Sequence, residues 1–100
     1  MFDYLNDKVI EWARKRGILE RENRYKQTIK IQEEIGELAG AILRDDEEKI
    51  IDGIGDGFVT LIILSKQLGL DPAECLLAAY DEIKDRKGEN KDGVFIKEEE

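Results

Sequence analysis

The sequence of 100 residues contains no histidine, one cysteine, one serine and one proline. Without histidine, imidazole acid–base catalysis and histidine metal ligands are excluded, and Ser65 cannot belong to a Ser-His-Asp triad. Cys75 alone permits neither an intrachain disulfide nor a cysteine-rich zinc site. Any chemistry must therefore be carried by carboxylates, lysines, arginines and tyrosines.

Charge and hydropathy narrow the class of protein further. The chain has 24 acidic and 16 basic residues, a net charge of −8, which weighs against a nucleic-acid polymer or an anionic membrane surface as partner. No apolar run is long enough to span a bilayer, and the N-terminus does not resemble a signal peptide. We therefore expect a soluble cytoplasmic protein of one domain, residues 1–100, that gains further burial as a homo-oligomer, either dimer or tetramer.

Apolar residues recur at helical spacing along most of the chain, which predicts an all-α fold of four helices. The N-terminal helix is expected at about 3–16, and the core helices at about 23–87. Asp45 or Asp46 can cap the third helix, and Asp71 followed by Pro72 is a typical helix start. We expect the four-helix units to assemble as an oligomeric helical bundle.

A C-terminal arm, residues 88–100, follows the predicted helices. Residues 90–93 resemble a turn, and residues 94–96 predict either a short strand or an ordered arm. We expect residues 97–100 to be frayed.

Five carboxylates form the pattern that points most directly to chemistry. Glu33, Glu34 and Glu37 share one flank of the second predicted helix, and Asp52 and Asp56 share a face of the third. Crowded like charges are unfavourable unless a cation lies between them, and Mg²⁺ prefers oxygen ligands and phosphate-bearing substrates. In so acidic a chain, the ordinary alternative is a solvated helix face.

Three glycines, Gly53, Gly55 and Gly57, fall among the aspartates of the third helix. A glycine inside a helix costs about 1 kcal/mol relative to alanine. This spacing predicts that another group approaches the backbone closely, either a ligand or a tightly packed helix.

Near the end of the fourth predicted helix lie Asp81, Lys84 and Arg86. Cations here can simply complement the helix dipole. Alternatively, they form a clamp for phosphate oxygens, a role in which lysine and arginine are common.

Taken together, these segments resemble the MazG-like nucleotide pyrophosphohydrolases of the all-α NTP pyrophosphatase superfamily, in particular small phage-type members. The matching segments are residues 33–39, 52–56, 84–88 and 92–97. The resemblance covers about residues 23–97, and it is the combination of segments that makes it specific.

The resemblance implies Mg²⁺-dependent cleavage between the α and β phosphates of a nucleoside triphosphate, giving a monophosphate and pyrophosphate. Mn²⁺ could replace Mg²⁺. Glu34, Glu37 and Asp56 would be metal ligands, and Glu33 would be a ligand or orient the attacking water; Glu33 and Glu34 are thus the candidate catalytic residues.

The resemblance also implies that substrate is bound by the fourth helix. Lys84 and Arg86 would contact phosphates, and Asp81 occupies a substrate-facing position where many relatives carry asparagine. Four aromatic residues are candidates to stack on the base, although core packing is the commoner role: Trp12, Tyr25, Phe58 and Tyr80.

One position departs from the family pattern. The glutamate usually found three residues before the aspartate is replaced here by Gly53. Asp52 lies one residue earlier, still roughly on the same helix face as Asp56. We expect Asp52 to take the missing ligand's place.

Two other functions remain open. The chain could be a non-catalytic, oligomeric helical module that binds nucleotide or metal, and Gly53 favours that alternative. It could also hydrolyse a different substrate, such as a phosphoribosyl-nucleotide. Base, sugar and number of metal ions are left undetermined.

Overall fold

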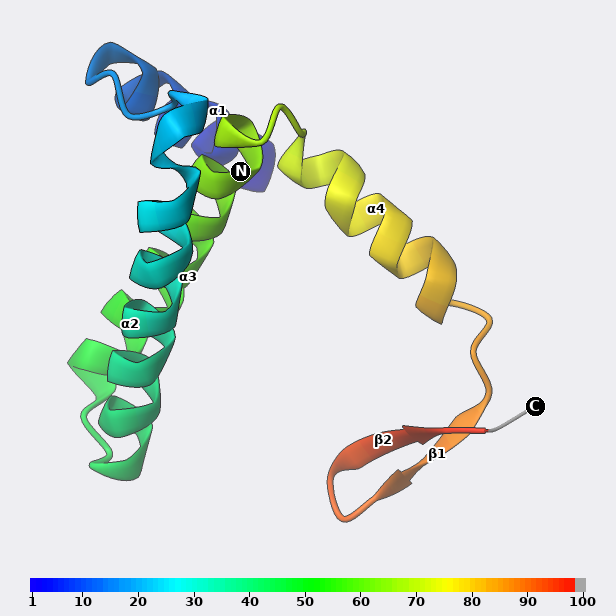
Figure 1. Cartoon of the computed structure of the whole chain (residues 1–100). Helices are drawn as coiled ribbons and strands as arrows, with labels where there is room; N and C mark the ends of the chain where they lie inside the picture. The colour runs from blue at the N-terminus through cyan, green and yellow to red at the C-terminus, as the bar shows by residue number, and fades with distance from the viewer. Residues whose placement is uncertain (99–100) are drawn as a thin grey trace.

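The computed structural model describes residues 1–98, which form four α-helices, one short 3₁₀ helix and a two-stranded hairpin (Figure 1). The elements in chain order are α1 (Phe2–Lys15), η1 (Arg21–Asn23), α2 (Arg24–Leu43), α3 (Glu47–Gln67), α4 (Pro72–Ile83), β1 (Gly88–Lys91) and β2 (Val94–Lys97). The mostly helical fold with four α-helices confirms the coarser part of the prediction, and the two-stranded hairpin lies within the predicted C-terminal arm.

Local sequence signals set the helix ends. The Asp46 side chain accepts a hydrogen bond from the Lys49 backbone N–H (3.3 Å) at the start of α3. Asp71 does the same for Ala73 (2.9 Å) at the start of α4, with Pro72 in the first turn. Gly17 and Gly69 take positive φ angles of 68° and 74° just beyond α1 and α3, where a residue with a Cβ would be strained.

The body of the molecule is the antiparallel hairpin of α2 and α3, with α1 packed against α3 (Figure 1). Gly53 is buried at the crossing, where a Cβ would lie 3.1 Å from Cβ of Leu38. Nearer the other end, the Gln27 amide donates to the Thr60 carbonyl (3.1 Å). The buried apolar core is small and consists of Ala13, Ala41, Ile62 and Ile63.

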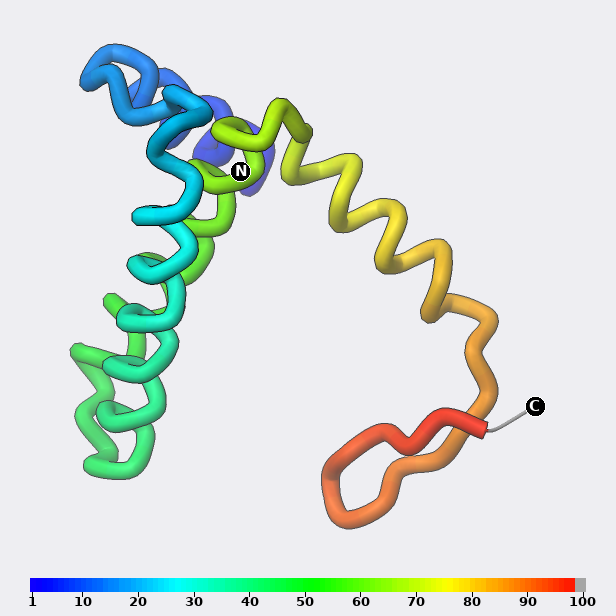
Figure 2. Tube along the Cα trace, in the orientation of Figure 1, coloured from blue at the N-terminus to red at the C-terminus, as the bar shows by residue number. Residues whose placement is uncertain are grey.

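α4 and the β-hairpin lead away from this body as an arm, residues 72–97 (Figure 2). The α3 and α4 axes differ in direction by 103°, and α4 contacts no described element other than α3. No single helix within residues 1–98 is long and apolar enough to cross a membrane; only the bent α3–α4 pair reaches that length and composition.

The hairpin closes on a two-residue turn. Asp92 and Gly93 have φ angles of 52° and 86°, and Asn90 accepts a hydrogen bond from the Gly93 N–H (2.8 Å). Asp-Gly with both φ angles positive is typical of a tight antiparallel hairpin. The predicted turn is thus confirmed at Asp92 and Gly93, but Asn90 and Lys91 belong to β1. Of the two alternatives for residues 94–96, the structure shows the strand, and Lys97 lies in β2 and is not frayed. Residues 99–100 of the predicted arm lie outside the described residues.

Candidate functional site

One pocket, of about 420 Å³, opens along an edge of the α2–α3 hairpin. All four predicted metal ligands line it: Glu34, Glu37, Asp52 and Asp56. The other residues that line it are Gly36, Leu38, Gly40, Arg44, Lys49 and Gly53. The structure therefore brings together, from two helices, the acids that the sequence pattern singled out.

Helix periodicity explains why these side chains share an edge. At about 100° per residue, Glu34 and Glu37 lie on one flank of the line through Leu38 that faces α3. Asp52 and Asp56 lie on one flank of the line through Gly53 that faces α2. Because the two helices are antiparallel neighbours in contact at Leu38 and Gly53, the two acidic flanks meet on the same side.

Glu34 is the most enclosed of the four acids, since only 12% of its side chain is exposed. Its Oε1 lies 3.3 Å from Nζ of Lys30, one turn earlier on α2. Hydrogen bonding and attraction to Glu34 raise the pKa of Lys30 above its ordinary value, with smaller contributions from Glu33 and Glu37. Lys30 thus supplies a local counter-charge to the acidic edge.

Two cations that the sequence patterns did not single out also line the pocket, Arg44 and Lys49. The Arg44 guanidinium folds back over Gly40, where Nη1 would lie 3.0 Å from an added Cβ. Lys49 lies seven residues before Asp56, two turns away on the same face of α3. That spacing alone could have predicted that Lys49 lies beside the acids of α3. Arg44 could not be predicted in this way, because it follows the end of α2 and its position depends on the turn between the helices.

Gly53 lines the pocket and also packs closely against Leu38 of α2. A side chain at this position would point into Leu38, because both Cβ and Cδ1 of Leu38 would lie 3.1 Å from the methyl group of an alanine there. A side chain at this position therefore requires Leu38 to shift by a few tenths of an ångström. Asp52 is exposed and lines the pocket one residue earlier, as expected of a residue that replaces the glutamate of the family pattern.

The remaining predicted site residues are not part of the pocket. Glu33 is exposed and does not line it. Asp81, Lys84 and Arg86 lie on or just after α4, in the arm that leads away from the α2–α3 hairpin (Figure 1). There Lys84 pairs with Asp81 (3.2 Å) and Arg86 with Glu82 (3.0 Å). Within one chain, the predicted phosphate clamp does not face the acids.

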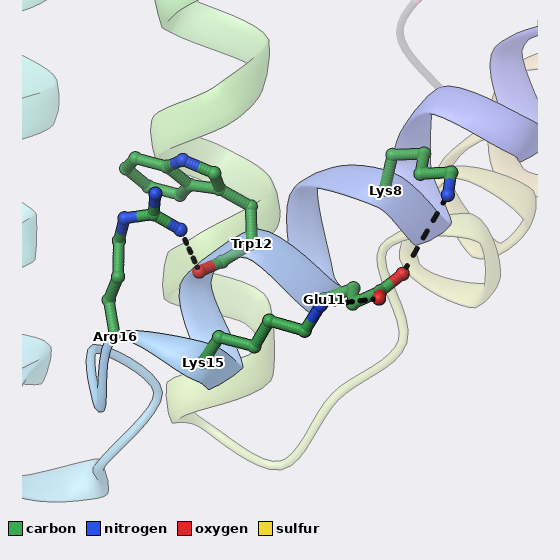
Figure 3. A network of polar contacts seen from close by, with 5 residues as sticks. All are labelled: Lys8, Glu11, Trp12, Lys15 and Arg16. Atoms are coloured by element: carbon green, nitrogen blue, oxygen red, sulfur yellow. Dashed lines mark hydrogen bonds and ion pairs between the residues drawn. The ribbon is translucent and has the colours of Figure 1, made fainter.

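The aromatic candidates for base stacking also lie outside the pocket. The Arg16 guanidinium covers the Trp12 ring at 4.3 Å and donates to the Trp12 carbonyl (3.0 Å), beside the Lys8–Glu11–Lys15 ion pairs (Figure 3). Tyr25 is covered by an arginine in the same way. Phe58 meets Phe2 edge to face, and Tyr80 belongs to the arm.

The donor set fits a hard divalent cation by its chemistry, because four carboxylates share one pocket and Mg²⁺ takes oxygen ligands. Among residues 1–98, however, no three acidic or cysteine side chains are gathered closely enough to form a ready metal cluster. The pocket therefore brings carboxylates together without forming a ready metal site in the described part of the chain.

Comparison with known proteins matches this chain to an uncharacterized phage protein, but to no family model. The chain is 41% identical over 61 residues to an uncharacterized 18.2 kDa protein from the rep-hol intergenic region of Haemophilus phage HP1. The matched part is 61% of this chain but 37% of that relative, so the chain spans little more than a third of its length. No family model and no solved structure matches. The MazG-like resemblance accordingly stays a prediction.

Proposed function

We propose that this protein is a Mg²⁺-dependent nucleoside triphosphate pyrophosphohydrolase, releasing a nucleoside monophosphate and pyrophosphate. The observation that carries the proposal is the pocket in which Glu34, Glu37, Asp52 and Asp56 meet two cations. A solvated acidic face accounts for carboxylates on one helix, but it does not by itself predict that acids of two helices line the same open pocket. The resemblance of the same segments to MazG-like enzymes supports the same chemistry.

Glu34, Glu37, Asp56 and Asp52 would hold the metal. When bound, Mg²⁺ supplies positive charge that offsets the triphosphate and the developing charge of the leaving pyrophosphate. The protein's own part is to place these oxygens on two packed helices, whose separation is fixed by the contact of Gly53 with Leu38. Mn²⁺ should substitute, because it accepts the same ligands.

Arg44 and Lys49 are the cations that the pocket offers to phosphate oxygens. Their charges are fixed near neutral pH, and arginine can contact two oxygens at once. Since no histidine exists, the proton of the attacking water would be taken by a carboxylate, or the bound metal would lower the pKa of that water. Glu34 lies in the pocket, whereas Glu33 would have to reach it from the exposed side of α2.

The decisive experiment measures pyrophosphate release from a panel of NTPs and dNTPs with Mg²⁺. The variants are Glu34→Gln, which removes a pocket carboxylate, and Glu22→Gln, which makes the same change on η1. We expect turnover in the parent and in Glu22→Gln, and its loss in Glu34→Gln. Glu33→Gln tests whether Glu33 takes part in catalysis. Turnover should fall in this variant only if the Glu33 side chain reaches the substrate.

A non-catalytic nucleotide- or metal-binding module is the second candidate. It is favoured by Gly53, which stands where the resembled family usually has a glutamate. Folded protein that binds Mg²⁺ or nucleotide in calorimetry, but releases no pyrophosphate from any member of the panel, would establish the module and refute the enzyme.

A further inference from the structure

The arm carries an apolar surface that no other part of residues 1–98 covers. Four side chains of α4, here called the arm stripe, recur at helical spacing and are more than half exposed: Leu76, Leu77, Tyr80 and Ile83. In the hairpin, Val94, Phe95 and Ile96 are also exposed. Within residues 1–98 the hairpin contacts no other element, and α4 contacts α3 alone.

A second apolar surface lies on the body and is about half exposed, although the Phe2 ring of α1 meets Phe58 edge to face. Its members on α3, here called the α3 stripe, are 48–65% exposed: Ile51, Ile54, Phe58 and Leu61. Phe58 lies about 200° round the helix from Asp56, so this stripe faces away from the acidic pocket. Ile35 and Ile42 of α2 are likewise about half exposed and border the same side.

The exposed area is larger than that of an independent domain of this size. The chain exposes 8165 Å². A folded monomer of 11.5 kDa is expected to expose about 5,800 Å². The difference, about 2,400 Å² per chain, is of the size that permanent interfaces bury. The radius of gyration, 16.1 Å, likewise exceeds the value of about 13 Å expected for a compact chain of 100 residues.

We propose that two copies of this chain exchange arms, so that the arm stripe of each copy packs on the α3 stripe of the other. The two surfaces match in extent, because the α3 stripe spans about 15 Å of helix and the arm stripe about 11 Å. They do not meet within one chain, since α4 leaves α3 at 103°. Reciprocal exchange about a two-fold axis covers both surfaces at once.

A second copy of this chain is favoured over an unrelated protein as the partner, because each copy carries one arm stripe and one α3 stripe. A face-to-face pairing of two bodies would cover the α3 stripe but leave the arm exposed. The segment between the helices, residues 68–71, contains Gly69 with a φ of 74° and is the place where the arm's direction is set.

Molecular mass and one matched pair of variants give the first test. By light scattering we expect a particle of twice 11.5 kDa at micromolar concentration. Leu76→Asp places a charge in the arm stripe and should weaken association at least a hundredfold. Cys75→Asp places the same charge off the stripe, about 140° round α4 from Tyr80, and should leave the mass unchanged. A monomer for the parent chain, or equal effects of the two variants, would overturn the exchange.

Cross-linking shows which surfaces meet. Two tagged chains, both with Cys75→Ser to remove the only cysteine, are co-expressed; one carries Leu77→Cys and the other Ile54→Cys. A short bismaleimide should join residue 77 of one chain to residue 54 of the other, as identified by mass spectrometry. Links only between two copies of residue 54 would show face-to-face bodies instead. In a chain carrying both cysteines, links only within monomers would show that α4 folds back on its own α3. Either result refutes the exchange, and neither depends on nucleotide turnover.

Discussion

The α2–α3 hairpin and the arm contain similar sequence patterns, charged residues beside apolar stripes, yet only the hairpin forms a pocket. On the hairpin, two helices are locked together at Gly53 and Leu38, so their acidic flanks enclose a shared cavity. On the arm, α4 contacts only α3 among the described elements, and its charged residues pair with one another. A charged flank therefore becomes a candidate site only where a second helix closes it.

The largest expected effect comes from removing one carboxylate from each region. Asp56→Asn, in the pocket, should lower kcat/KM at least about a hundredfold, as expected when a preorganised electrostatic group is lost. Asp81→Asn, the same change on α4, should alter it little in one chain, because Asp81 lies outside the pocket. Steady-state kinetics of pyrophosphate release measures both. A larger loss for Asp81→Asn would show that the arm reaches the substrate.

Two glycines of α3 test the helix contact on which the pocket depends. Gly53→Ala would place a methyl group 3.1 Å from Leu38 and should destabilise the fold by roughly 1–3 kcal/mol. Gly55→Ala meets nothing within 4 Å and should stabilise it by up to about 1 kcal/mol. Thermal and urea unfolding give both values. If both substitutions changed the free energy of unfolding in the same direction, Gly53 would not be a packing contact.

Lysines in the two regions should differ in their effect on substrate binding. Lys49→Gln removes a cation from the pocket and should raise KM for a nucleoside triphosphate about tenfold, the scale of one charged hydrogen bond. Lys84→Gln removes a cation already paired with Asp81 and should change KM much less. A larger increase in KM for Lys84→Gln than for Lys49→Gln would show that the arm binds the phosphates, as the family resemblance implies.

The smallest expected effect is electrostatic. Because Glu34 raises the pKa of Lys30, Glu34→Gln should return that pKa toward 10.5, and Glu33→Gln should lower it less. Since the pKa is raised in the folded state, the stabilisation from this pair is complete below 10.5 and is lost as pH rises through the folded value. NMR titration of the Lys30 side chain follows the shift, and an equal response to both variants would contradict the pairing with Glu34.

Local signals predicted most of the secondary structure. The caps at Asp46 and Asp71 and the glycines after α1 and α3 fixed helix ends, because these depend on residues a few positions apart. The grouping of the four acids followed from helix periodicity for the same reason. The second strand was predicted, but its partner was missed because Gly88–Lys91 carries no apolar alternation, and the Asp92-Gly93 turn brings it into register.

By itself, the sequence determined the helices, their caps and the flank on which each acid lies, since these are set by contacts within a turn or two of the chain. Tertiary structure decided that Gly53 faces Leu38, that Arg44 and Lys49 join the acids, and that Lys84 and Arg86 do not. Those outcomes depend on how two helices pack and on the direction the chain takes after Gly69. Neither is encoded in the periodicity of a single helix, because both arise from contacts between residues distant in sequence.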